Sequence, residues 1–87
     1  MTSKILRPAG VMERAGMGNT ATYEAEAAEL LPQFFKINGG RASGVFEDEL
    51  EEVLDARAGG ATDEEVRRIV RRQVERRKKR FEELRAA

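Results

Sequence analysis

The chain has 87 residues, and its 16 Lys and Arg side chains are balanced by 16 Asp and Glu. The sequence contains neither Cys nor His, which excludes disulfides, thiolate chemistry and the commonest general base and metal ligand. No apolar run approaches the roughly 20 residues that span a bilayer, and no secretory signal is visible, so we expect a cytoplasmic protein with no membrane partner, no cofactor and no enzymatic activity.

The neutral total hides an uneven distribution of charge. Residues 1–62 carry six basic and ten acidic side chains, a net charge of −4, whereas residues 63–87 carry ten basic and six acidic ones, a net charge of +4. Such segregation indicates two surfaces with different partners and keeps nucleic acid among the candidates. We therefore divide the chain into a domain of residues 1–58 and a basic amphipathic C-terminal helix within residues 59–87.

The first elements form a helix–turn–helix pattern. Residues 4–6 suit a short strand or an extended lead-in, and Pro8 suits the first turn of a helix that runs to about Ala15. Glycines in residues 16–18 end that helix. A second helix is predicted from about Thr20 to Glu29, with Asn19 or Thr20 as its cap, before Pro32 prevents its continuation.

A β-hairpin and a third helix follow. Phe34, Phe35 and Ile37 favour a strand, Asn38-Gly39-Gly40 is a strong turn signal, and the return strand is expected at about residues 41–45. We expect the phenylalanines to belong to the core and not to stack on bases. Residues 47–58 then have helical spacing of apolar side chains and an acidic first turn.

The last helix has the clearest start signal. Thr62 and Glu65 form the pattern of a capping box, so a helix is predicted from about Asp63 to beyond Lys79. Its apolar stripe has two interpretations: it folds back on the domain, or it pairs with a second copy. The hypothetical homodimer seam consists of Val66, Val70 and Val74.

A wider pattern runs through residues 4–57. It consists of Ile5-Leu6-Arg7, Val11-Met12, Gly16, Thr22-Tyr23, Leu31-Pro32, Lys36-Ile37, Gly40-Arg41-Ala42, Gly44 and Glu49-Leu50. This pattern resembles the AlpA family of prophage regulators and excisionase-like proteins. The resemblance implies a fold that is mainly α with a small β-hairpin: a winged helix–turn–helix related to MerR-type heads, here with a long C-terminal helix. It also implies a DNA-binding role in transcription control or recombination of a mobile element.

Two positions depart from that family. Val45 stands where the family commonly has Trp. The second helix carries Glu24, Glu26 and Glu29, where the family usually has Arg or Lys. Because phosphate charge dominates affinity for DNA, three carboxylates on a groove-reading helix are unfavourable, although a single Glu can accept a hydrogen bond from a cytosine amino group.

Two functional hypotheses therefore stand side by side. In the first, duplex DNA is contacted by the second helix, the hairpin and the basic helix through Thr20, Thr22, Tyr23, Lys36, Arg41, Arg67, Arg71, Arg76, Lys78 and Lys79. Thr20 is also a candidate cap, and Tyr23 a candidate core residue. In the second, Glu24, Glu26 and Glu29 mimic DNA and bind a basic nucleic-acid-binding protein, as some phage-encoded inhibitors of host defence do.

Overall fold

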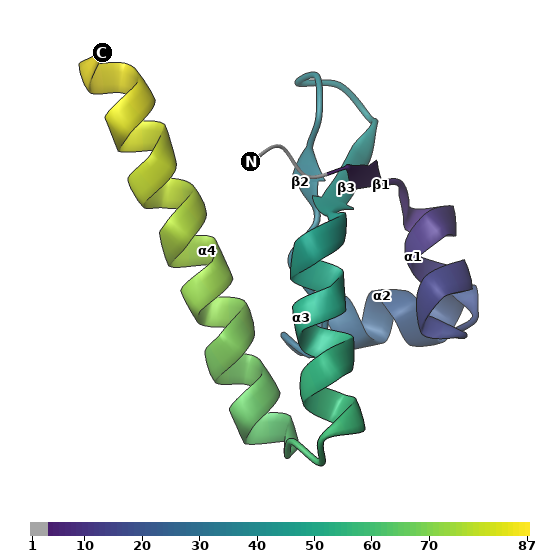
Figure 1. Cartoon of the computed structure of the whole chain (residues 1–87). Coiled ribbons are helices and arrows are strands. Elements are labelled where there is room, and N and C mark those ends of the chain that lie inside the picture. Colours follow the sequence, from purple (N-terminus) through teal and green to yellow (C-terminus); the bar gives the residue numbers. More distant parts are fainter. Residues whose placement is uncertain (1–3) are drawn as a thin grey trace.

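The structure, a computed structural model, describes residues 4–87. Within this range the chain forms four helices and a three-stranded antiparallel sheet (Figure 1), so the prediction of a mainly helical chain with a small β-hairpin is confirmed at that level. The elements in chain order are β1 (Ile5–Leu6), α1 (Pro8–Ala15), α2 (Asn19–Ala27), β2 (Phe35–Lys36), β3 (Ser43–Phe46), α3 (Glu47–Ala58) and α4 (Asp63–Ala86).

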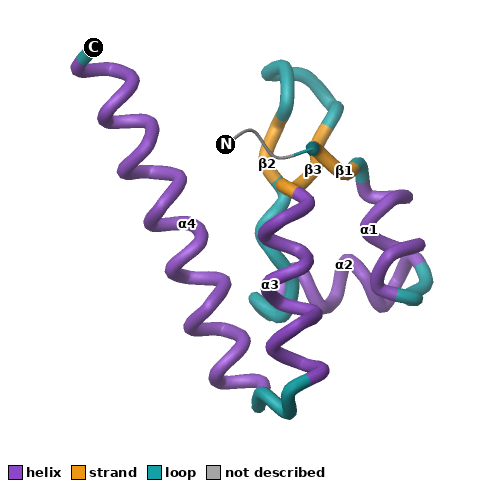
Figure 2. Tube along the Cα trace, in the orientation of Figure 1, coloured by secondary structure: helices purple, strands orange, loops and turns teal. Residues whose placement is uncertain are grey.

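The helices are arranged around α3. Figures 1 and 2 show α3 between α4 on one side and the α1–α2 pair on the other, with the strands gathered at the end opposite the α3–α4 loop. The α1 helix begins at Pro8, as predicted, and ends at Gly16 in the left-handed conformation, with φ 65°. Glycine adopts this conformation without a steric penalty, which lets the chain turn sharply towards α2.

The sheet is short, and β3 forms its centre. Leu6 of β1 pairs with Val45, and Phe35 of β2 pairs with Gly44. Val45 is fully buried and packs with Leu6, Val11, Leu31 and Leu50 in the first core cluster. The sheet is thereby fixed to both α1 and α3.

Gly44 is expected to tolerate no side chain. A Cβ at this position would lie 2.6 Å from the Leu6 carbonyl oxygen and 2.9 Å from Ile5 Cγ2, and a paired backbone cannot move aside. Gly44→Ala should therefore lower the free energy of unfolding by about 1–3 kcal/mol. Gly10→Ala is the matched control: its Cβ meets only the Leu6 side chain at 3.6 Å, so this helical position should gain about 0.5–1 kcal/mol. Urea denaturation measures the free energy of unfolding of both variants. If Gly44→Ala and Gly10→Ala change it equally, the close approach of the Leu6 carbonyl to Gly44 is not what excludes a side chain.

A second core cluster joins α4 to the rest of the molecule. Thr62 and Glu65 form the predicted capping box, and the stripe of α4 then places Val66 and Val70 against Val53 of α3, with Leu30 packed alongside. Val66 and Val70 are fully buried and Val74 is partly buried. The predicted dimer seam through these three valines is therefore wrong, because the stripe folds back on its own domain.

Candidate nucleic-acid interface

The α1 and α2 helices form two short helices joined by a three-residue turn. Met17 donates its backbone N–H to the Met12 carbonyl at 3.0 Å, and Gly18 is the N-cap of α2 in an extended conformation. The first helical residue is therefore Asn19, and no side chain caps the helix. The prediction that Asn19 or Thr20 caps α2 is wrong, because Gly18 already provides the turn.

Thr22 does not lie on the outer face of α2. Its side chain is fully buried, and its Oγ1 donates a hydrogen bond to the Gly18 carbonyl at 2.7 Å. This hydroxyl ties the first turn of α2 to the preceding loop. The prediction of Thr22 as a DNA contact is thus corrected: the residue positions the helix and is not available to a ligand.

Six residues of α2 are exposed, and four of them recur at intervals of three and four and so form one face, here called the exposed face: Thr20, Tyr23, Glu24 and Ala27. Tyr23 is 46% exposed, and its ring meets the Phe34 ring edge-on with centroids 5.7 Å apart. That contact fixes the direction of the tyrosine while leaving its outer edge accessible. The α2 helix itself carries no Lys or Arg, so any attraction to phosphate must come from neighbouring segments.

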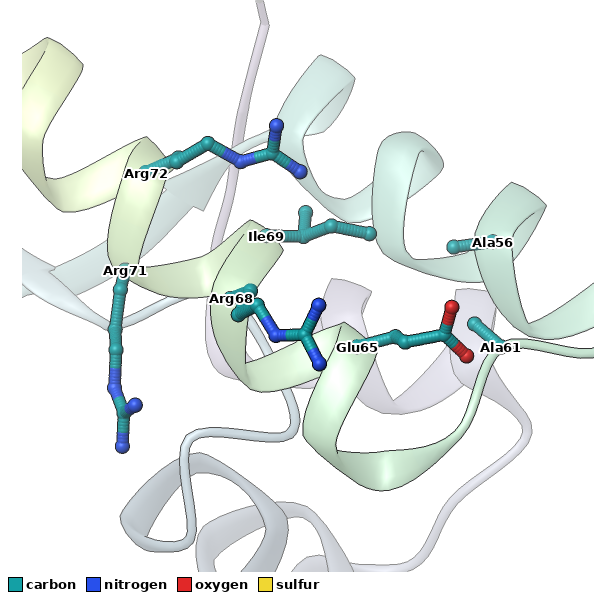
Figure 3. Close-up of a pocket in the computed structure, with 7 residues that line it drawn as sticks. All are labelled: Ala56, Ala61, Glu65, Arg68, Ile69, Arg71 and Arg72. Atoms are coloured by element: carbon teal, nitrogen blue, oxygen red, sulfur yellow. The ribbon is translucent and has the colours of Figure 1, made fainter.

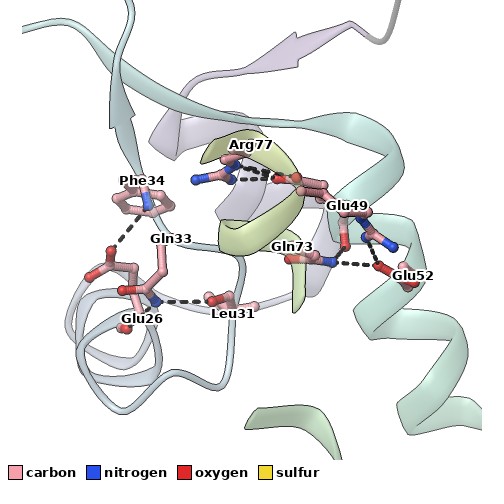
Figure 4. A network of polar contacts seen from close by, with 9 residues as sticks. Glu26, Leu31, Gln33, Phe34, Glu49, Glu52, Gln73 and Arg77 are labelled. Atoms are coloured by element: carbon pink, nitrogen blue, oxygen red, sulfur yellow. Dashed lines mark hydrogen bonds and ion pairs between the residues drawn. The ribbon is translucent and has the colours of Figure 1, made fainter. Parts of the chain in front are cut away.

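Glu26, which belongs to the alternative acidic site, is used inside the molecule. Its carboxylate accepts a hydrogen bond from the Phe34 backbone N–H at 3.1 Å, and its carbonyl accepts one from Gln33 Nε2 at 2.8 Å (Figure 4). These bonds hold the chain that leads from α2 into β2. Glu26 is therefore a structural residue, which the sequence alone did not indicate.

Glu29 is likewise engaged, beyond the end of α2. The helix ends at Ala27, two residues earlier than predicted, and Glu29 adopts φ 61°. Its two carboxylate oxygens accept hydrogen bonds from Arg71 of α4 at 3.0 and 3.3 Å. Of the three acidic residues in this segment, Glu24 is the one for which the structure gives no side-chain partner within residues 4–87.

The hairpin between β2 and β3 forms the candidate wing. It is wider than the predicted tight turn, because residues 37–42 form a loop closed by the Ile37 N–H and the Ala42 carbonyl at 2.9 Å. Within it, Asn38 Oδ1 accepts from the Gly40 N–H at 3.0 Å. Lys36 and Arg41 are both exposed, as expected for phosphate contacts.

The predicted cations of α4 divide into two groups. Arg67 donates to the Ala28 carbonyl at 3.0 Å, Arg71 binds Glu29, and Arg76 pairs with Glu52 at 2.9 Å. These three arginines hold α4 against α3 and against the segment that follows α2. Lys78 and Lys79 lie nearer the end of α4 and are exposed, with Lys78 3.8 Å from Glu75. Part of the predicted basic tail is therefore used for contacts within the molecule and is not free to bind a ligand.

An open hollow lies between α3 and α4. Its volume is about 600 Å³, and it is lined by Ala56, Ala61, Glu65, Arg68, Ile69, Arg71 and Arg72. In Figure 3, Arg68, Ile69 and Arg72 extend towards α3, whereas Arg71 extends away. Because a carboxylate and guanidinium groups share its rim, this outer surface has mixed charge and is not a uniform phosphate-binding face.

The contact between α3 and α4 contains a polar network that was not predicted from the sequence. Gln73 is fully buried, and its Nε2 donates to the Glu49 carbonyl at 3.0 Å and to Glu52 at 2.8 Å (Figure 4). Arg77 pairs with Glu49 and lies over the Phe35 ring, 5.0 Å from its centroid. The available signal was the spacing, since both residues continue the stripe of Val66 and Val70.

The carboxyls of this fold predict a loss of stability in acid. The hydrogen bond from Arg71 lowers the pKa of Glu29, and hydrogen bonds from Thr62 lower the pKa of Glu65. Burial raises the pKa of Glu52, but hydrogen bonds from Gln73 and Arg76 outweigh it and lower the pKa overall. Their stabilisation is complete above the ordinary glutamate pKa of about 4.3 and is lost as the pH falls through the folded values.

The test is the free energy of unfolding between pH 6 and pH 3. We expect it to fall steadily below about pH 4.3, and Glu52→Gln should flatten that decline. Glu75→Gln, at an exposed position of α4, is the control and should leave the slope unchanged. A Glu52→Gln profile parallel to that of the unaltered chain would contradict the assignment.

Comparison with known proteins identifies no relative: the chain matches no family model, no curated protein and no solved structure. Over residues 4–87, no helix has the length and apolar character needed to cross a membrane, and no His, Cys, Asp and Glu side chains cluster in a way that could hold a metal ion.

Proposed function

We propose that this chain is a small duplex-DNA-binding protein that acts as a transcriptional regulator or an excisionase-like factor of a mobile element, as its resemblance to the AlpA family implies. One observation supports this most directly: Glu26 and Glu29 are bound within the molecule, so α2 presents Glu24 beside Thr20 and Tyr23. A groove accommodates one carboxylate far more readily than three.

In the proposed mechanism, α2 recognises bases, and the wing and the end of α4 contact the phosphate backbone. The exposed face of α2 enters the major groove, where Thr20 and Tyr23 approach base edges or phosphates and Glu24 accepts a hydrogen bond from an amino group. Lys36 and Arg41 of the wing contact a phosphate strand, and Lys78 and Lys79 supply further positive charge. Because phosphate contacts release counterions, affinity should fall steeply as salt rises.

The alternative is that α2 binds a basic nucleic-acid-binding protein in place of DNA. A DNA mimic needs an array of carboxylates that are available to its partner. Here Glu26 and Glu29 are committed to Phe34 and Arg71, which leaves Glu24 alone on the exposed face. The acidic mimic is therefore the less supported hypothesis.

Selection from a random duplex pool tests the proposal. The purified chain is incubated at about 50 mM salt with 20-bp duplexes of random sequence, and bound DNA is recovered and sequenced through several rounds. We expect enrichment of a defined motif. The proposal fails if repeated rounds leave the pool random while the chain remains folded by circular dichroism.

A further inference from the structure

The last turns of α4 separate from the rest of the molecule (Figures 1 and 2). The α4 helix has 24 residues and α3 has 12, and the two helices are joined by the short loop of residues 59–62. At about 1.5 Å per residue, α3 therefore runs beside only the first half of α4. Beyond it, Arg77 still packs over Phe35 and Phe46 of the sheet, but Figure 1 shows residues 78–86 leading away from α3 and apart from the β2–β3 hairpin.

This projecting segment continues the apolar stripe of α4. Phe81 and Leu84 follow Val70, Val74 and Arg77 at intervals of three and four residues, which places them on one side of the helix. They are 57% and 58% exposed, the two largest values among the large apolar side chains of residues 4–87. The face that is buried at Val70 therefore becomes open to solvent at Phe81.

Basic side chains flank these two residues. At 100° per residue, Lys78 and Arg85 lie on one flank of Phe81 and Leu84, and Arg80 lies on the other. Arg85 also lies over the Phe81 ring, 5.3 Å from its centroid. Lys78 and Arg80 have only long, exposed ion pairs to Glu75 and Glu83, at 3.8 and 3.6 Å, and such pairs are easily exchanged for a better partner.

The positive charge beside Phe81 and Leu84 indicates which kind of partner can bind there. A second copy of the same segment would bring like charges together across the contact, which is unfavourable. A phosphate backbone would leave Phe81 and Leu84 without apolar neighbours. We propose that the terminal face of α4, formed by Phe81 and Leu84 with Lys78, Arg80 and Arg85, docks an acidic protein segment that presents apolar side chains between carboxylates.

A displayed peptide library tests this surface on the whole chain. A library of 16-residue random peptides is selected against the immobilised protein without DNA, because Lys78 is also a proposed phosphate contact, and the affinities of enriched peptides are then measured. We expect the enriched peptides to combine Asp and Glu with large apolar residues. Phe81→Ser/Leu84→Ser should weaken their binding at least tenfold, and Lys78→Glu/Arg85→Glu should do so by a comparable factor.

Ile37→Ser provides the matched control, because it removes a 38% exposed apolar side chain from the wing and should leave peptide affinity unchanged. Unchanged unfolding midpoints of all three variants establish that the fold is retained. Three results would each overturn the proposal: no enrichment, enriched peptides without carboxylates, or binding that survives the double serine variant. The proposal would also be overturned if analytical sedimentation showed a homodimer that dissociates in the Phe81→Ser/Leu84→Ser variant.

Discussion

Replacing Arg77 by Ala is expected to lower the free energy of unfolding by about 3 kcal/mol, the largest effect of any single side-chain removal considered for this chain. The Arg77 and Glu49 side chains are only 19% and 10% exposed, and Arg77 also lies over the Phe35 and Phe46 rings. Its removal leaves a nearly buried carboxylate without its partner and opens the contact between α4 and the sheet.

Arg76→Ala is the matched control for this prediction. The neighbouring Arg76 pairs with Glu52, but those two side chains are 59% and 41% exposed, and exposed ion pairs contribute about 0–1 kcal/mol. Urea denaturation followed by circular dichroism measures both variants. If Arg76→Ala and Arg77→Ala lower the free energy of unfolding equally, the buried Glu49–Arg77 pair does not stabilise the packing of α4 more than the exposed pair does.

Replacing Glu24 by Gln is expected to raise affinity for duplex DNA and to change the preferred base. Removal of one negative charge about 4 Å from a phosphate gains roughly 1 kcal/mol in water, or about fivefold in affinity. A carboxylate accepts from the cytosine amino group, whereas a glutamine amide matches the acceptor and donor of adenine. The motif selected by the variant should therefore show adenine where the unaltered chain selects cytosine.

Glu75→Gln removes the same charge from α4, where the carboxylate lies 3.8 Å from Lys78, and serves as the control for reading of the groove by α2. It should leave the selected motif unaltered and raise affinity by less than Glu24→Gln does. Parallel selections on the three proteins provide the comparison. If Glu24→Gln and Glu75→Gln give the same motif and the same affinity, α2 does not read the groove through Glu24.

Local signals were enough to predict most elements of the fold. Pro8 sets the start of α1, the acidic turn after Phe46 sets that of α3, and Thr62 with Glu65 sets that of α4. Each of these signals acts within one turn of helix, so it is visible in a few neighbouring residues. The fold-back of α4 was one of two interpretations, because an apolar stripe does not specify which surface covers it.

The contacts and exposure of the candidate site residues were harder to predict. Glu26 binds a backbone N–H eight residues further along the chain, and Glu29 binds Arg71 across 42 residues. Thr22 was a candidate DNA contact next to Tyr23, but its side chain is fully buried and its hydroxyl donates to the Gly18 carbonyl. Contacts of this kind depend on tertiary structure and leave no local pattern.

Binding of duplex DNA by the exposed face of α2 and the wing is the core of the proposed function. Its most direct test is a fluorescence anisotropy titration of a selected 20-bp duplex with the unaltered chain between 50 and 300 mM salt. We expect saturable binding whose log affinity falls linearly with log salt, by about 0.9 for each phosphate contacted. No saturable binding at 50 mM salt, or an affinity independent of salt, would contradict it.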